Sequence, residues 1–192
     1  MRFLVIAISL LTTAPAAAEL RPGDVVFQTS RSEQGRVIRE VTGSPWSHVG
    51  IVLERGDELW VLEAVSPVRW TRLEVWRRHG AGHRVLARRL DRELSARELA
   101  ALTREGERLL GRPYDTRFEW GDERLYCSEL VFLVFQRALE IELVTPQRWR
   151  ELELGPRGRA LARRRLGHLP PPDGIVVTPS ALARSDTLVT VR

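Results

Sequence analysis

Two β-rich runs joined by a short polar segment constrain the fold of this chain more than any other feature. The runs are Ser47–Leu53 (SHVGIVL) and Glu58–Ala64 (ELWVLEA), and the sequence between them is ERGD. Gly56 suits a turn position that needs positive φ, so the pattern predicts an antiparallel β-hairpin. We expect the hairpin to belong to a small, barrel-like antiparallel sheet packed against helices.

Further strands and helices are expected on both sides of the hairpin. The expected strands are Val25–Phe27, Val68–Leu73, His83–Leu86 and Ile175–Val177. The expected helices are Ser30–Val41 with Ser30 as its N-cap, Ser95–Leu110 with Ser95 and Glu98 as a capping box, and Tyr126–Leu139. A length of 192 residues and a hydrophobic content of 43% fit one α+β domain with its own core.

The first eighteen residues are typical of a signal peptide. Arg2 supplies a positive charge, FLVIAISLL is an apolar run, and Ala16–Ala18 offers the small residues of a cleavage site. The apolar run is much shorter than the roughly 20 residues that span a membrane, and no Cys follows it for lipid attachment. We therefore expect cleavage after Ala18, a periplasmic or secreted protein without a stable membrane anchor, and a mature single domain of residues 19–192.

The composition of the chain excludes several kinds of catalytic and metal site. All 30 basic residues are Arg, which excludes a lysine Schiff base, a P-loop lysine and a Ser-Lys dyad. The single Cys excludes an internal disulfide framework and a cysteine-rich zinc site. The dense run Arg157–Arg165 (RGRALARRR) is interpreted mainly as a solvated helix face, with docking on an anionic envelope surface as the alternative. No nucleic-acid-binding motif accompanies it, so no nucleic acid partner is expected.

Cys127 lies at the expected start of the helix Tyr126–Leu139. The unpaired N–H groups and the dipole of a helix N-terminus stabilise a thiolate, and the same groups can receive an oxyanion. The structural alternative is a small buried hydrophobic residue, a common role of free Cys. The position of Cys127 in an exported protein with a suitable His elsewhere favours a nucleophile.

His48 is the preferred partner for this thiol. If Arg55 and Gly56 form a two-residue turn, Glu63 lies directly across the hairpin from His48. Its carboxylate would then hold the imidazole in the tautomer that accepts the thiol proton. The structural alternative for His48 is an ordinary strand histidine, and for Glu63 it is a charge at the edge of the sheet.

The other three histidines are weaker candidates. His79 and His83 flank a polar glycine-containing loop, and two histidines alone make a poor metal site. His168 follows Cys127 in the order seen in some cysteine enzymes, but it lies in a proline-rich loop. No metal site is expected.

Several short motifs, taken in order, resemble a known family. Gly111–Asp115 (GRPYD) and Tyr126–Val131 (YCSELV) resemble the nucleophile region of NlpC-type cysteine peptidases. The segments Arg21–Asp24 (RPGD) and Ser47–Val52 (SHVGIV) precede them, which is a permuted order. The arrangement resembles the YiiX-like branch of permuted papain-like hydrolases, which is related to the lecithin–retinol acyltransferase group. It implies an α+β, permuted papain-like fold.

The resemblance also implies roles for individual residues. It implies a Cys nucleophile, a His base and a polar orienter, which match Cys127, His48 and Glu63. It places Tyr114 and Ser128 near the oxyanion or the substrate, and it implies neither a metal nor an organic cofactor. The sequence has Ser-Glu after the nucleophile, where ordinary NlpC enzymes usually have Ser-Gly. The resemblance therefore supports the fold more strongly than it supports a peptidoglycan substrate.

These features predict a cysteine hydrolase that cleaves an amide bond through an acyl-enzyme on Cys127. A cell-wall peptide is the expected substrate, because the protein is expected to be exported. The alternatives are a lipid ester hydrolase or acyltransferase, and a non-catalytic envelope binding module. An apolar groove would favour a lipid, a narrow polar cleft would favour a peptide, and an unreactive buried Cys127 would favour the binding module. The sequence does not indicate an oligomeric state.

Overall fold

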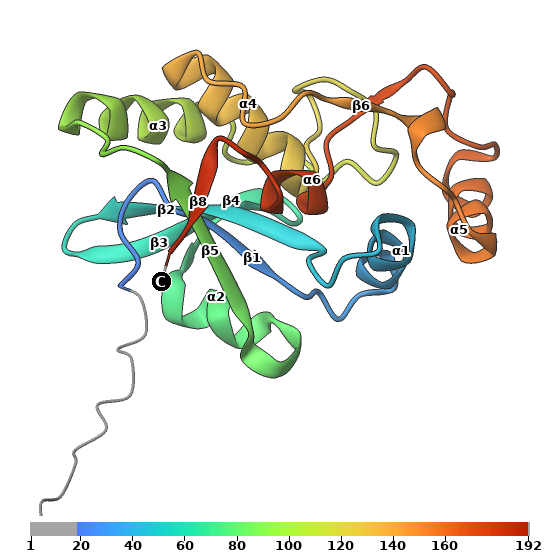
Figure 1. The fold of residues 1–192 in the computed structure, drawn as a ribbon, viewed down its shortest axis with the longest axis horizontal. Helices are drawn as coiled ribbons and strands as arrows, with labels where there is room; N and C mark the ends of the chain where they lie inside the picture. The colour runs from blue at the N-terminus through green and yellow to red at the C-terminus, as the bar shows by residue number, and fades with distance from the viewer. Residues whose placement is uncertain (1–18, 192) are drawn as a thin grey trace, which may run out of the picture.

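A six-stranded antiparallel sheet forms the centre of the protein in the computed structural model, which describes residues 19–191 (Figure 1). The predicted signal peptide, residues 1–18, lies outside the described residues. The strand order is β4-β3-β2-β1-β5-β8. These strands are β1 (Val25–Gln28), β2 (His48–Arg55), β3 (Glu58–Ala64), β4 (Val68–Arg72), β5 (Val85–Leu90) and β8 (Leu188–Thr190). A separate two-stranded sheet pairs β6 (Gln147–Arg148) with β7 (Ile175–Val176).

Helices cover both faces of the central sheet. They are α1 (Glu33–Thr42), α2 (Leu73–His79), α3 (Ala96–Arg108), α4 (Cys127–Leu139), α5 (Pro156–Leu166) and α6 (Pro179–Ala183), with 3₁₀ turns η1 (Ala81–His83) and η2 (Trp149–Glu151). In Figure 1, α3 and α4 lie above the sheet and α2 lies below it, while α1 and α5 occupy one end of the molecule. None of the helices within residues 19–191 has the length and hydrophobicity to cross a membrane.

The core has two layers because side chains of the strands alternate between the two faces. Val25 and Phe27 of β1 belong to the cluster that includes α4, whereas Val26 packs with Trp76 of α2. The first nine residues of α4 are all buried, and most of them are apolar, as expected of a helix at the centre of the core. The predicted α+β class is therefore built around a central α4 and a sheet that is covered on both faces.

The predicted hairpin is confirmed, but its predicted register is wrong. Arg55 pairs with Glu58, so the turn consists of Gly56 and Asp57, and Gly56 has φ of 63°. Glycine adopts this positive φ without strain, and Arg55 stays in the strand. Continuing the register places Glu63 across from Gly50, two residues beyond His48. Because side chains alternate with a period of two, a two-residue shift keeps Glu63 on the same face of the sheet as His48.

Other predicted boundaries also differ from the structure. The N-cap of α1 is Ser32, whose hydroxyl accepts the Gly35 N–H at 3.0 Å, and not Ser30. The expected strand Val68–Leu73 ends one residue earlier, because Leu73 is the first residue of α2 and is buried with Trp76 on the helical side. The strand expected at His83–Leu86 starts at Val85 and continues to Leu90, and β8, which was not predicted, pairs with it.

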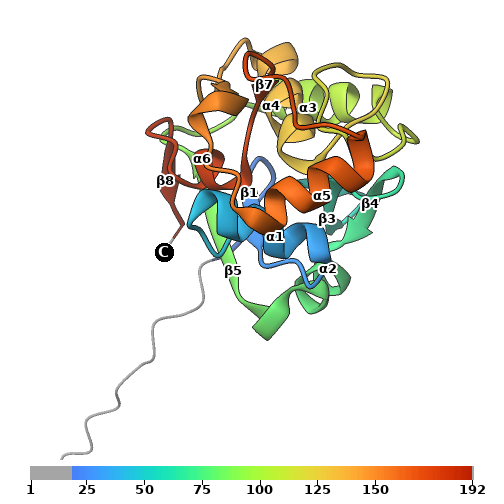
Figure 2. The ribbon, with the colours of Figure 1, turned by 90° about the vertical axis from the view of Figure 1, so that its right-hand side faces the viewer.

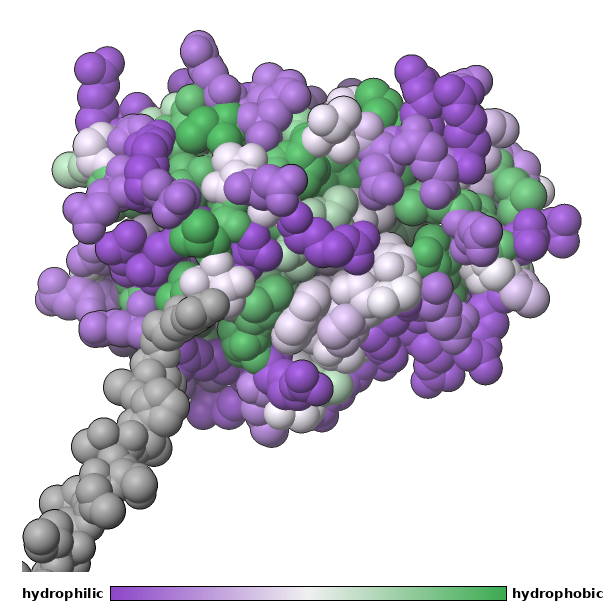
Figure 3. All heavy atoms as spheres, viewed as in Figure 1, coloured by the Kyte–Doolittle hydropathy of each residue, from purple (hydrophilic) through white to green (hydrophobic). Residues whose placement is uncertain are grey.

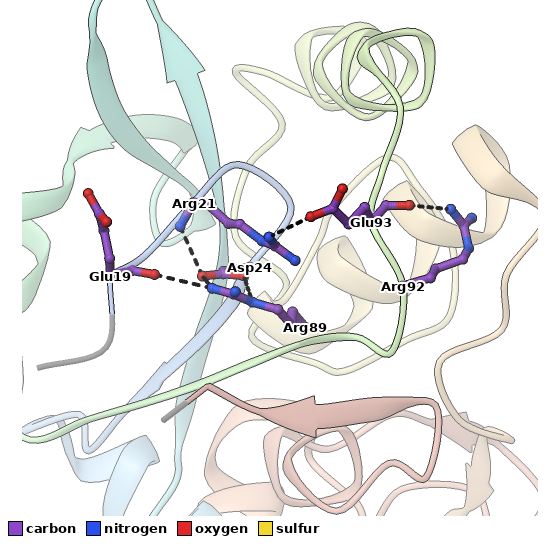
Figure 4. A network of polar contacts seen from close by, with 6 residues as sticks. All are labelled: Glu19, Arg21, Asp24, Arg89, Arg92 and Glu93. Carbon is purple, nitrogen blue, oxygen red and sulfur yellow. Dashed lines mark hydrogen bonds and ion pairs between the residues drawn. The ribbon is translucent and has the colours of Figure 1, made fainter.

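The beginning of the described chain is fastened to β5 by a network of polar contacts (Figure 4). Asp24 is buried, and the Arg89 guanidinium donates to both of its carboxylate oxygens at 2.8 Å. Arg89 also donates to the Glu19 carbonyl at 3.2 Å. Arg21 forms an exposed ion pair with Glu93 at 3.4 Å. Hydrophilic residues alternate with smaller hydrophobic patches over the face that Figure 3 shows.

Candidate active site

Cys127 is the first residue of α4, as predicted, and it is buried. The N-cap, Tyr126, provides no side-chain hydrogen bond, so the first turn of the helix keeps N–H groups for other partners. The next residue, Ser128, donates its hydroxyl to the Val177 carbonyl at 2.8 Å and so ties the helix start to the segment before α6. Cys127 therefore sits at a rigid helix N-terminus.

The structure brings Glu63 to His48 by a diagonal contact across the hairpin. His48 Nε2 lies 2.6 Å from Glu63 Oε2. The same carboxylate accepts the Thr71 hydroxyl at 2.6 Å and the Trp76 indole N–H at 3.0 Å. Burial raises the pKa of Glu63, but its bond to His48, the Thr71 hydroxyl and the Arg69 guanidinium lower it, and the net shift is downward. Glu63 is therefore an ionised carboxylate that holds the imidazole.

Gly50 makes this contact possible. A Cβ at Gly50 would lie 2.4 Å from Val61 Cγ1 and 2.8 Å from the Leu62 carbonyl oxygen. The absence of a side chain there allows β3 to pack closely, and nothing stands between His48 and Glu63 on that face. A diagonal pair of this kind is within reach of long side chains in an antiparallel sheet.

The His48 ring also interacts with Cys127, although the two come from different elements. Burial lowers the pKa of His48, but hydrogen bonds with Cys127 and Glu63 and the charges of these groups raise it to about 10. Since Glu63 holds Nε2, Nδ1 is the ring nitrogen that remains for Cys127. Such a histidine carries a proton at neutral pH and can form an ion pair with a thiolate. Of the three residues predicted as a triad, His48 and Glu63 are in direct contact, and Cys127 is one of the groups that raise the pKa of His48.

Tyr114 pairs through its backbone with Leu125, two residues before Cys127, and its side chain contacts Gln34, a residue that was not predicted. Its hydroxyl accepts the Gln34 Nε2–H at 2.6 Å. Burial and the negative charge of Cys127 raise the pKa of Tyr114 well above the ordinary value of 10.0, so the hydroxyl stays protonated. Gln34 shares one helix face with Ile38 and Val41, and a polar residue in that apolar stripe is the signal that could have identified it.

An apolar pocket reaches Cys127 from the direction of α1 and α5. Its cavity volume is about 80 Å³, and its lining is almost entirely apolar. Apart from Cys127 and Ser128, the lining includes Val37, Ile38, Val41, Phe118, Trp149, Leu161, Ala162 and Leu166.

A second cleft adjoins it, and we call it the polar cleft because most of the residues that line it have polar side chains. This cleft includes His48 and Tyr114, and it shares Gln34 and Arg165 with the apolar pocket. The candidate site therefore has an almost entirely apolar side and a side that is rich in polar side chains.

The arginine-rich helix α5 forms one wall of this pocket and lies beside α1 (Figure 2). Arg164 pairs with Glu33 at 2.6 Å, and Arg157 pairs with Glu40. A Cβ at Gly158 would lie 3.3 Å from Val41 Cγ2, so glycine permits the close approach of the two helices. The interpretation of Arg157–Arg165 as a solvated face thus holds for one side of the helix only.

The comparisons with known proteins agree with this geometry. Residues 19–192 match the family described as permuted papain-like amidase enzyme, YaeF/YiiX, C92 family. The chain belongs to this C92 family. It is 37% identical to the uncharacterized protein YiiX of Escherichia coli (strain K12) over 193 residues, covering 100% of this chain and 96% of that protein. The predicted YiiX-like, permuted papain-like family and fold are therefore confirmed.

A solved C92 relative supports the fold directly. The crystal structure of metalloprotein yiiX from Escherichia coli O157:H7 matches with a TM-score of 0.86 and 38% identity, covering 90% of this chain and 96% of that chain. In the present protein, residues 19–191 contain no group of three or more His, Cys, Asp and Glu side chains arranged to hold a metal ion. Glu63, the acid nearest to His48, is engaged with the imidazole and two further donors. These residues do not fit a metal centre, whereas membership of the C92 family supports an amidase.

Proposed function

We propose that the protein is an exported cysteine amidase that hydrolyses the amide of an apolar acyl group through an acyl-enzyme on Cys127. The observation that carries the proposal is the apolar pocket, because Cys127 is part of its lining. His48 serves as the proton carrier and Glu63 as its orienting carboxylate. The papain-like amidases of the C92 family supply the class of reaction.

The first half of the reaction forms a thioester. The Cys127 thiolate attacks the amide carbonyl carbon, and the carbonyl electron pair moves onto oxygen. In this proposal the Tyr114 hydroxyl and the first N–H groups of α4 donate to the oxyanion. The oxyanion then collapses, the C–N bond breaks, and the His48 imidazolium protonates the leaving nitrogen.

The second half releases the acid. Neutral His48 takes a proton from water, and the resulting hydroxide attacks the thioester carbonyl. The C–S bond breaks, a carboxylic acid leaves, and the thiolate and imidazolium are restored. An acyl acceptor other than water would make the same thioester an intermediate of acyl transfer.

The two sides of the site suggest how a substrate lies. An acyl chain would enter the apolar pocket, where it would displace water from the aliphatic side chains of α1 and α5. The leaving amine would then lie in the polar cleft, on the side of His48 that can protonate it. A cell-wall peptide, the substrate expected from export, has few groups that such a lining favours, so we place it second.

The test is to incubate the mature protein with three substrates and follow the products by mass. The substrates are a long-chain N-acyl amide, the matching N-acetyl amide and peptidoglycan fragments, each with wild type and Cys127→Ala. We expect release of the long-chain acid, little release of acetate, and no turnover by Cys127→Ala. Cleavage of peptidoglycan fragments alone would favour the cell-wall alternative, and a wild type that forms no acyl-enzyme with any substrate would favour a binding module.

A further inference from the structure

Arg165, Gln34 and Tyr114 form a string of hydrogen bonds that ends beside Cys127. Arg165 Nη1 donates to Gln34 Oε1, and Gln34 Nε2 donates to the Tyr114 hydroxyl oxygen at 2.6 Å. The three residues come from α5, α1 and the segment that precedes α4, so only the folded chain brings them together. All three side chains border the polar cleft of the site.

The chemistry of the groups fixes the direction of each bond. A guanidinium can only donate, so the Gln34 atom that faces Arg165 is the amide oxygen. The amide nitrogen, which can only donate, then faces Tyr114. The Tyr114 oxygen is therefore used as an acceptor, and its single proton has to be donated elsewhere.

The remaining direction for that proton is the reactive side of the site. The backbone of Tyr114 pairs with Leu125, two residues before Cys127, and its side chain borders the same cleft as His48. The charge of Cys127 also contributes to the raised pKa of Tyr114. We propose that Gln34, oriented by Arg165, is a positioning residue that commits the Tyr114 hydroxyl to donate toward the oxyanion formed at Cys127. The inference rests on the proposed function, since it concerns the same thioester-forming step. It assigns a role to two residues outside the predicted triad.

Two small reagents separate this role from the general reactivity of Cys127. p-Nitrophenyl acetate acylates the thiol through an oxyanion, with release of p-nitrophenolate. Iodoacetamide alkylates the thiol by displacement of iodide at a saturated carbon, and no oxyanion forms. The ratio of the two rate constants therefore reports on oxyanion donors, and the acetyl group is too small to depend on the apolar pocket.

Gln34→Glu is the decisive variant, because a carboxylate accepts the Tyr114 proton and can still bind Arg165. We expect acylation to fall about 10²-fold, the usual effect of losing one oxyanion donor, while alkylation changes less than about threefold. Gln136→Glu, the same substitution on α4 nine residues after Cys127, should leave both rates unchanged. Equal thermal unfolding of the variants checks that the fold is kept.

A double-mutant cycle distinguishes proton direction from the added charge. Tyr114→Phe should lower acylation by as much as Gln34→Glu, and the combination should be no slower than Tyr114→Phe alone. If the losses add, the introduced carboxylate acts through its charge alone and the proposal is wrong.

Arg165 is tested by a variant and its conservative rescue. Arg165→Met leaves the Gln34 amide free to rotate and exchange the positions of its oxygen and nitrogen, so this variant should lower the rate of acylation but not of alkylation. Arg165→Lys supplies a donor and should restore most of the acylation rate. Unchanged acylation in Gln34→Glu or in Arg165→Met would overturn the inference while leaving the proposed function intact. Failure of wild type to be acylated would overturn both.

Discussion

Both oxygens of the Glu63 carboxylate are already engaged in the folded chain. Three donors, from His48, Thr71 and Trp76, converge on them. An amide at this position has one acceptor oxygen and brings its own donors, so at least one buried donor would lose its partner. Glu63 is thus held for one task, the orientation of His48.

We therefore expect Glu63→Gln to lower kcat by about 10²-fold or more, because the imidazole loses the group that fixes its tautomer. Steady-state kinetics with an activated acyl substrate would measure this. Glu58→Gln is the matched control, since Glu58 is an exposed residue of the same strand. Equal losses in both variants would show that the effect does not come from the site.

The pairing of Cys127 with His48 predicts a reactive thiol. Because the pKa of His48 is raised to about 10 when it interacts with Cys127 and Glu63, the imidazolium persists well above neutral pH and stabilises the thiolate. Iodoacetamide should label Cys127 readily at about pH 6, where ordinary thiols react slowly. His48→Ala should slow labelling by about tenfold or more. Equally slow labelling of the folded wild type and His48→Ala, with equal labelling after denaturation, would make Cys127 a structural residue.

At the scale of a single element, the start of α4 carries an acid that the reaction does not use. Glu129 is fully buried, and its Oε1 accepts the Gly121 N–H at 3.0 Å. Burial, outweighing this bond, raises the pKa of Glu129 to about 8, with a further contribution from the charge of Asp115. The acid fastens the loop before α4 to the helix that presents Cys127.

The raised pKa predicts a pH-dependent stability. From pH 4.5 upward the unfolded chain loses the Glu129 proton while the folded chain keeps it, so stability falls until about pH 8, where the folded chain ionises as well. Glu129→Gln should match wild type near pH 5 and exceed it by up to about 3 kcal/mol near pH 7.5. Denaturant unfolding at the two pH values measures this, with the exposed Glu123→Gln as control. A constant difference across this pH range would contradict the prediction.

Helix α5 sets the width of the apolar pocket. Ala162 lines the pocket, whereas Ala160 on the same helix is exposed. Ala162→Phe should slow hydrolysis of a long-chain amide about tenfold or more relative to an acetyl ester, because the added ring occupies space for the chain. Ala160→Phe should leave the ratio unchanged. A ratio that stays at the wild-type value in Ala162→Phe would argue against the pocket as the acyl site.

At the scale of the whole molecule, export remains a prediction with a sharp test. Cleavage after Ala18 would leave Glu19 as the first residue, and the Glu19 carbonyl contacts Arg89. The next residue, Leu20, is buried in the core layer on the α2 side of the sheet. We expect intact-mass measurement of an envelope fraction to give a chain that begins at Glu19. A cytosolic protein that retains Met1 would contradict this expectation.

The sequence allowed some parts of the site to be predicted and not others, for physical reasons. Cys127 and His48 lie in regular elements with local signals, and strand alternation kept Glu63 on the correct face although its register was shifted. Gln34 and Arg165 meet across 131 positions of the chain, through the packing of α1 on α5. Neither local propensity nor spacing specifies such a contact, and the pocket between these helices was unpredictable for the same reason.

The division of the site between the two core layers has a consequence for when the protein can act. Glu63 and its partner Trp76 belong to the layer on the α2 side, whereas Cys127 begins the helix of the opposite layer. Neither layer alone holds a nucleophile beside its base, so the active site forms only when the whole domain has folded. A chain that crosses a membrane unfolded would be harmless to the amides of the compartment where it is made, and it would acquire its activity where it folds.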